Sequence, residues 1–98
     1  MIAVTCQITA KEGQELALKN AFMAQIIACT HHAGLVLYSV HQNTAHAGSF
    51  IFYEQWESRA ALDAHLASPE LQAFRERTLP LMENRRIDIW DMLAREPR

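Results

Sequence analysis

Residues 50–69 decide the fold, and they read FIFYEQWESRAALDAHLASP. The first part of this stretch carries bulky apolar side chains on both alternating sides, which is typical of a strand buried on both faces. Ser58 is a preferred residue for the N-terminal cap of a helix, so a short helix is predicted from there to Leu66. Ser68 and Pro69 form a second start signal, because proline is favoured at the first position of a helix. The stretch therefore predicts a strand followed by a broken helical region.

The neighbouring sequence repeats these two patterns. Strands are expected at residues 2–9, 35–42, 49–56 and 85–93, and helical regions at residues 14–32 and 58–80. The first helix has one apolar stripe, formed by Leu18, Phe22, Ile26 and Cys29, with Gly34 as its expected C-terminal cap. The resulting order, β-α-β-β-α-β, is that of the ferredoxin-like α+β fold, in which both helical crossovers cover one face of an antiparallel sheet.

The length of the chain limits the number of layers. Its 98 residues, 50% of them apolar and 20% charged, suffice for one domain with a core, which we expect to span residues 1–98. A second helical layer does not fit into a domain of this size. The predicted strands still present apolar side chains on the uncovered face, and large apolar patches are rare on soluble monomers. We therefore expect a homodimer in which two sheets pack face to face.

The charge and the apolar runs exclude several classes of protein. The net charge is −2 and the sequence pI is about 6.2, so the chain has no cationic excess with which to bind nucleic acid. The N-terminal residues lack an early basic residue and a long apolar run, so neither a signal peptide nor a membrane span is expected. Cys6 and Cys29 are expected to be free thiols in a reducing compartment, which favours a cytoplasmic protein.

Histidine is the first candidate for chemistry, because its unperturbed pKa lies near neutral pH. His31 and His32 are predicted in the last turn of the first helix, where they would interact with the helix dipole. His46 is predicted to lie in a loop, and His41, near the end of a strand, could face either side. His65 is predicted to point inward, either as a hydrogen-bonded core residue or as a general base beside a cavity.

A carboxylate and an aromatic ring accompany this histidine. Glu54 and Trp56 share one face of their strand, although Glu54 could also bind a neighbouring arginine such as Arg86. The chain contains no CxxC or HExxH motif, no glycine-rich phosphate loop and no serine nucleophile elbow. We therefore expect no metal ion and no cofactor, and chemistry that relies on acid-base groups and on the reactivity of the substrate.

Residues 50–58 followed by residues 60–69 resemble the antibiotic biosynthesis monooxygenase family, whose signature joins an E-x-W strand end to an A-L-x-x-H-L helix and an S-P turn. Gly13, Gly34 and Tyr38 also fall where that family usually has them. The resemblance implies a dimeric α+β barrel with a pocket between the sheet and the helices of each subunit. Members include cofactor-independent monooxygenases of quinols and polycyclic phenols. In that chemistry the deprotonated substrate itself reduces O₂, which requires a base, an oxyanion partner and a dry aromatic pocket.

The sequence departs from the family pattern at several positions. The usual Glu-Pro-Gly-Cys before the second strand reads His-Ala-Gly-Leu at residues 32–35, and the histidine often found after Ser-Pro is Glu70. Haem-degrading relatives use a tryptophan and a histidine where this chain has His65 and Arg75, which disfavours haem degradation. A further branch, which isomerises a phosphorylated dione, shares the tyrosine, the glutamate and the helix histidine.

These considerations predict a cytoplasmic monooxygenase that oxidises a small quinol-like or phenolic metabolite with O₂, with His65 as general base, assisted by Glu54. The residues expected to bind the substrate are Trp56, Tyr38, Phe52, His41 and Glu70. Two alternatives stay open. One is an isomerase of a small phosphorylated dione, which would need the same base but no O₂. The other is a non-catalytic dimeric module that binds a small hydrophobic ligand.

Overall fold

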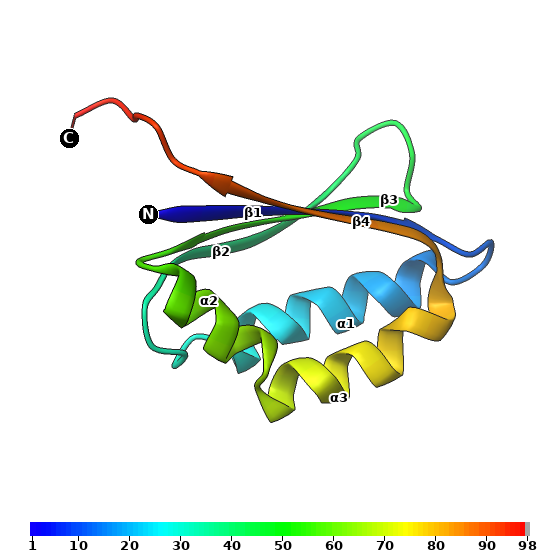
Figure 1. The fold of residues 1–98 in the computed structure, drawn as a ribbon. Coiled ribbons are helices and arrows are strands. Elements are labelled where there is room, and N and C mark those ends of the chain that lie inside the picture. Colours follow the sequence, from blue (N-terminus) through cyan, green and yellow to red (C-terminus); the bar gives the residue numbers. More distant parts are fainter. Residues whose placement is uncertain (98) are drawn as a thin grey trace.

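The computed structural model of the protein describes residues 1–97, and Arg98, the last residue of the predicted domain, lies outside the described residues. The elements are β1 (Ile2–Ala10), α1 (Glu15–Ala28), β2 (Leu35–Gln42), β3 (Ser49–Trp56), α2 (Arg59–Leu66), α3 (Pro69–Thr78), the short 3-10 helix η1 (Leu79–Leu81) and β4 (Met82–Asp91). The strands form one antiparallel sheet in the order β2-β3-β1-β4. All three α-helices lie on the same face of this sheet (Figure 1). The predicted ferredoxin-like α+β fold is confirmed.

The first helix ends four residues earlier than the sequence predicted. It stops at Ala28, and the hydroxyl of Thr30 then donates to the carbonyl of Ile27 at 3.1 Å, which satisfies a carbonyl at the helix end. His31 and His32 consequently lie in the turn that follows, so the prediction that they occupy the last turn of the helix is wrong. The last strand also differs, since it spans 82–91 rather than 85–93.

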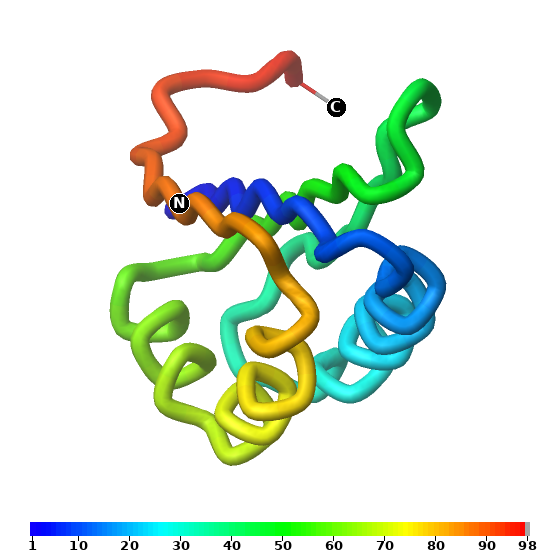
Figure 2. Tube along the Cα trace, turned by 90° about the vertical axis from the view of Figure 1, so that its right-hand side faces the viewer, coloured from blue at the N-terminus to red at the C-terminus, as the bar shows by residue number. Residues whose placement is uncertain are grey.

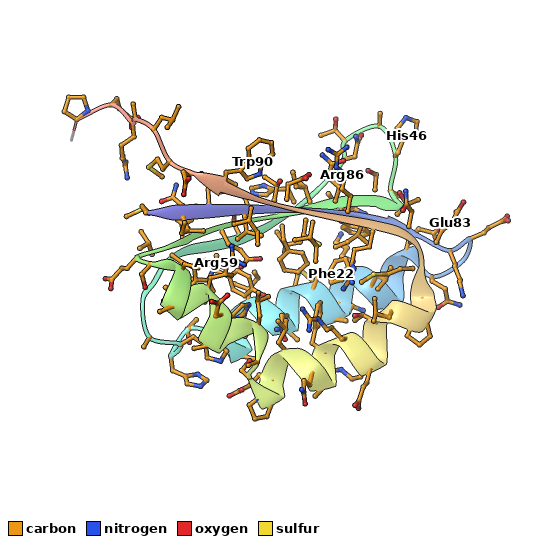
Figure 3. All side chains as sticks on the ribbon, in the orientation of Figure 1. Phe22, His46, Arg59, Glu83, Arg86 and Trp90 are labelled. Carbon is orange, nitrogen blue, oxygen red and sulfur yellow. The ribbon has the colours of Figure 1, made fainter. Side chains whose placement is uncertain are left out.

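Phe22 anchors the core between α1 and the sheet (Figure 3). Its ring lies edge-on to Phe50 and Phe52 of β3, with centroid distances of 5.1 and 5.0 Å, which is a favourable aromatic geometry. Leu18 is buried one turn earlier on α1, as the predicted apolar stripe requires. The central strands and α1 thus form one continuous core on the helix-covered face.

The register of the strands decides which side chains face the helices. Val4 of β1 and Tyr38 of β2 both lie opposite Glu54 of β3, so these three share the covered face. The uncovered face carries Trp90 and Arg86 of β4 (Figure 3). The loop between β2 and β3 and the segment after β4 both project on this uncovered side (Figure 2).

Both predicted helix starts are confirmed. The Ser58 hydroxyl accepts a hydrogen bond from the backbone N–H of Ala61 at 3.1 Å, and the Ser68 hydroxyl accepts one from Leu71 at 3.3 Å. The Ser68 hydroxyl also donates to the carbonyl of His65 at 2.7 Å, which ties the end of α2 to the start of α3. His65 therefore lies close to a junction between α2 and α3 that is fixed by hydrogen bonds.

The cysteines agree with the expectation that they are free thiols. Cys6 and Cys29 are both free, and burial raises the pKa of each thiol to about 11. No helix within residues 1–97 is long and apolar enough to cross a membrane.

Gly34 is predicted to be indispensable for the packing of the 29–34 turn on α2. Its φ is +79°, and a Cβ there would lie 2.5 Å from the Cβ of Ala61. Gly13 has a similar φ of +84° but open space around it, so it is a matched control. In chemical denaturation, Gly13→Ala should lower the free energy of unfolding by only about 1–2 kcal/mol, which is the conformational cost of a positive φ. Gly34→Ala should lower it by about 3 kcal/mol or more, because its Cβ also clashes. Equal losses in the two variants would contradict the close approach of Gly34 to α2.

Candidate active site

A cavity lies between the sheet and the helices α2 and α3. Its floor is made of buried, mostly apolar side chains: Val4, Ile8, Phe52, Leu71, Phe74 and Thr78. Leu79, Arg85 and Ile87, which are exposed, line its mouth. The cavity measures about 60 Å³, which is room for a few water molecules. Pockets that enclose drug-sized ligands measure roughly 300–1,000 Å³, so a ring-sized substrate requires the side chains at the mouth to move.

Two ionisable side chains meet on the wall of this cavity. The Nε2 atom of His65, on α2, lies 3.9 Å from Oε1 of Glu54, on β3, and both side chains are nearly inaccessible to solvent. Tyr38 and Phe52 also line the cavity, and the ring centroids of Tyr38 and His65 are 5.5 Å apart. The structure thus brings together four of the predicted site residues.

Trp56 lies behind this pair rather than in the cavity, which it does not line. Its ring lies against the imidazole of His65, tilted by 35° with a centroid distance of 4.5 Å, and its Nε1–H donates to Oε1 of Glu54 at 2.9 Å. Instead of forming a wall for the substrate, Trp56 fixes the orientation of both ionisable groups. The alternative that Glu54 pairs with Arg86 is wrong, because Arg86 lies on the uncovered face and pairs with Asp88 at 2.9 Å.

Burial reverses which member of this pair holds the proton, since an exposed carboxyl normally loses its proton at a lower pH than an exposed imidazolium. Burial raises the pKa of Glu54 to about 7, although the hydrogen bond from Trp56 partly opposes the shift. Burial, with smaller effects from the nearby His32 and Arg75, also lowers the pKa of His65 to about 4. Between these values the carboxyl keeps its proton while the imidazole is neutral. The cavity wall therefore carries a proton donor beside a neutral base.

A second group of ionisable residues lies on the outer side of His65. Nδ1 of His32 is 2.8 Å from Nδ1 of His65, and Nε2 of His32 is 3.6 Å from Oε2 of Glu70. The other carboxylate oxygen of Glu70 lies 3.2 Å from Nε2 of His31, which is largely exposed. Glu70 thus lies in a surface groove and not in the cavity, where the sequence had placed it.

Two histidines lie elsewhere than the sequence predicted. His41 lies on the uncovered face, opposite Ile51, with its Nε2 3.0 Å from the Ser39 hydroxyl, so the structure does not bring it to the cavity. His32 was not among the predicted site residues, because the helix was expected to continue through it. Thr30 was the available signal, since threonine hydroxyls compete for backbone groups and favour helix ends.

A metal ion would have to use the same histidines. Cys29, His32 and His65 offer ligand atoms that all lie within 4.8 Å of one another, and so do His31, His32 and Glu70. The two Nδ1 atoms of His32 and His65 are, however, only 2.8 Å apart. Two nitrogen ligands of one tetrahedral zinc ion lie about 3.3 Å apart, given Zn–N bonds of about 2.0–2.1 Å. The rings would therefore have to separate to hold a metal, whereas their present spacing is that of a hydrogen bond.

Known proteins share this fold and parts of this sequence. A crystal structure of a Deinococcus radiodurans protein assigned to the antibiotic biosynthesis monooxygenases superposes with a TM-score of 0.91 at 19% identity, covering 100% of this chain and 98% of that one. The protein PA3566 from Pseudomonas aeruginosa gives a TM-score of 0.88 at 29% identity, with 95% and 94% covered. An uncharacterized Synechocystis protein, sll1783, is 32% identical over 72 residues, which cover 74% of this chain but only 47% of that protein. The chain thus matches about half the length of this curated relative.

The family model named antibiotic biosynthesis monooxygenase matches residues 1–77. This match includes β1, the strand that carries Glu54 and the helix that carries His65, so it covers the buried pair, whereas the cavity-lining residues from Thr78 to Ile87 lie beyond it. The chain belongs to the antibiotic biosynthesis monooxygenase family.

Proposed function

We propose that the protein is a cofactor-independent monooxygenase that oxidises a small quinol-like or phenolic metabolite with O₂. The observation that carries the proposal is the buried Glu54–His65 pair on the wall of an apolar cavity. Family membership supports oxygenase chemistry. The proposal includes a cytoplasmic location, which the two unpaired thiols of Cys6 and Cys29 support.

The first step is removal of the phenolic proton. An ionised Glu54 is suited to accept it, because a general base works best when its pKa lies near the operating pH. Nε2 of neutral His65 is the next proton acceptor, and at 3.9 Å from the carboxylate it receives the proton through one water or after the two groups approach. Arg75 and Arg85 line the same cavity and can stabilise the phenolate by charge.

The second step is reduction of O₂ by the substrate itself. For a hydroquinone, one oxygen atom is inserted into the ring and the other leaves as water, so the product is a hydroxylated quinone. All four electrons come from the substrate, and the protein contributes proton transfer and an environment from which bulk water is excluded. The apolar lining from Phe52, Leu71 and Phe74 fits that requirement.

A second candidate function is isomerisation of a small phosphorylated dione. Arg75 and Arg85 at the cavity favour this alternative, because two cations suit an anionic substrate. The reaction would use the same base and no O₂. Turnover under anaerobic conditions would therefore identify an isomerase, and ligand binding without turnover in either atmosphere would identify a non-catalytic binding module.

We also propose that two copies associate through the uncovered sheet face. Leu37 and Trp90 expose apolar surface there, next to the partly exposed ring of Tyr53. Such a contact would bury the face that the chain is too short to cover with its own helices.

Oxygen uptake with a hydroquinone tests the proposed chemistry. Glu54→Gln and His65→Gln should each lower kcat by about 10²–10⁴-fold, which is the usual contribution of general acid–base catalysis. His46→Gln is the control, because His46 lies in the exposed loop between β2 and β3, far from the cavity (Figure 3). Unchanged turnover in both cavity variants would remove the Glu54–His65 pair from the mechanism.

The inverted protonation order also predicts how stability depends on pH. Between pH 4.5 and about 7, the Glu54 carboxyl is protonated in the folded protein but ionised in the unfolded chain. Its contribution to stability therefore falls as pH rises through that window. Between about pH 4 and 6.5, the His65 imidazole is neutral in the folded protein but protonated in the unfolded chain. Its contribution to stability therefore rises with pH through that window. Each contribution amounts to about 3 kcal/mol, and in the wild type they largely cancel.

Urea unfolding at a series of pH values separates the two contributions. Glu54→Gln should become more stable as pH rises from about 4 to 6.5, and His65→Gln should become less stable from about 4.5 to 7. If both variants follow the wild-type curve, the protonation order of the pair is not inverted.

Analytical ultracentrifugation tests the proposed dimer. The wild type should sediment as a dimer at micromolar concentration, and Trp90→Arg should weaken association by at least about tenfold, because buried tryptophans often dominate interfaces. Ile27→Arg is the matched control, since Ile27 is an exposed apolar residue on the helical side. A monomeric wild type, or equal effects of the two variants, would contradict this assembly.

A further inference from the structure

The hydrogen bond between His32 and His65 restricts the tautomers of both rings. Their Nδ1 atoms are 2.8 Å apart, so one of them must carry a hydrogen and the other must accept it. A neutral imidazole carries only one hydrogen. Whichever ring donates through Nδ1 therefore has a bare Nε2, and the choice decides whether His65 presents an acceptor or a donor to the cavity.

Glu70 biases this choice through His32. An ionised carboxylate only accepts hydrogen bonds, and Oε2 of Glu70 lies 3.6 Å from Nε2 of His32. The backbone N–H of Glu70 at the start of α3, together with His32 and His31, lowers the pKa of this carboxyl, which favours its ionised form. Attraction to the carboxylate places the hydrogen of His32 on Nε2, and its Nδ1 is then the acceptor.

The remaining hydrogen must then lie on Nδ1 of His65. We propose that Glu70, acting through His32, holds His65 in the Nδ1–H tautomer, so that its unprotonated Nε2 is the atom near Glu54 at the cavity wall. We further propose that the three side chains conduct a proton from the cavity to the surface. The tautomer stands on the contacts alone, whereas the proton path rests on the proposed function.

The placement of the three residues fits such a path. His65 lines both the cavity and the surface groove on its outer side, whereas His32 and Glu70 line only the groove. Solvent exposure of their side chains rises outward, from 2% for His65 to 9% for His32 and 35% for Glu70. The chain of groups therefore connects a closed compartment with water.

Proton transfer along this path needs no co-reactant. A proton binds to Nε2 of His65, the Nδ1 proton of His65 moves to Nδ1 of His32, and the Nε2 proton of His32 moves to the carboxylate of Glu70, which releases it to water. One proton enters and one leaves, and both rings are then in the opposite tautomer. Glu70 draws His32 back to the Nε2–H form once the protons of the two rings have exchanged with water, which restores the path for the next proton. Trp56 packs against the ring of His65 and donates to Glu54, and Tyr38 meets the ring edge, so neither hydrogen-bonds its Nδ1. Cys29, whose Sγ lies within 4.8 Å of a ring nitrogen of each histidine, accepts a hydrogen bond from the Gln25 amide at 3.3 Å. Arg75 has only a charge effect, which disfavours the imidazolium.

Nitrogen NMR of the substrate-free protein tests the tautomer. Long-range ¹H–¹⁵N spectra of the imidazoles, recorded on the ¹⁵N-labelled full chain near neutral pH and assigned with His65→Gln and His32→Gln, distinguish protonated from bare ring nitrogens. In the wild type, His65 should be protonated at Nδ1 and bare at Nε2. Glu70→Gln should convert His65 to a mixture of tautomers, because an amide can donate to as well as accept from His32.

Glu76→Gln is the matched control, because Glu76 is an exposed glutamate on the same helix. It should leave the His65 signals unchanged, and the backbone amide spectrum verifies that each variant is folded. Two results would overturn the proposal: a wild-type His65 protonated at Nε2, or identical His65 signals in Glu70→Gln and Glu76→Gln.

Kinetics test the proton path separately. If hydroquinone oxidation is observed, Glu70→Gln should lower kcat severalfold with KM unchanged and should alter the pH profile, whereas Glu76→Gln should do neither. An unaltered profile in Glu70→Gln would overturn the path. Absence of turnover in the wild type would contradict the proposed function. The NMR spectra would still test the tautomer independently.

Discussion

The burial of the Glu54 carboxyl is the constraint on which the rest of the site depends. Glu54 lies on the central strand β3, between Val4 and Tyr38 on the neighbouring strands, and faces the helices. A buried charge without a partner is costly, so the group keeps its proton to near neutral pH and takes one hydrogen bond from Trp56. His65 is buried in the same place and stays neutral. A pair that would form a salt bridge at the surface is thus kept uncharged.

The fold fixes the positions of both side chains of the Glu54–His65 pair. Glu54 is fixed by the hydrogen-bonded ladders on both sides of β3, and His65 is fixed by the capped corner between α2 and α3. The turn after α1 brings His32 against the outer edge of His65, because Gly34 allows the chain to approach Ala61 closely. Three separate segments of the chain therefore meet at one imidazole, with the cavity on one side and water on the other.

Most of the fold was predictable from local patterns in the sequence. The β-favouring side chains of β2, the two apolar sides of β3 and the caps Ser58 and Ser68 predicted correct element bounds, because each depends on neighbours in the chain. The inward position of His65 followed from its spacing to Leu62 on the same helix.

The site was predictable only in part, because it depends on tertiary contacts. Period-two alternation places His41 and Tyr38 on opposite faces of β2, but it does not say which of these faces the helices cover. That depends on the pairing with β3, which puts Tyr38 opposite the buried Glu54 and His41 opposite Ile51. The role of His32 depends on the close approach of Gly34 to α2, which no local pattern encodes. Trp56 was placed correctly on the face of Glu54, but its full burial behind the cavity depends on how α2 packs over it.

Infrared spectroscopy of the protonated carboxyl tests the central claim most directly. A buried protonated Glu54 has a carbonyl stretch that is separate from ionised carboxylates, and it can be followed between about pH 5 and pH 8 in difference spectra of the wild type against Glu54→Gln. We predict a band that is absent from Glu54→Gln and that disappears with a midpoint of about 7. Loss of the band at the pH where exposed glutamates ionise would contradict the account.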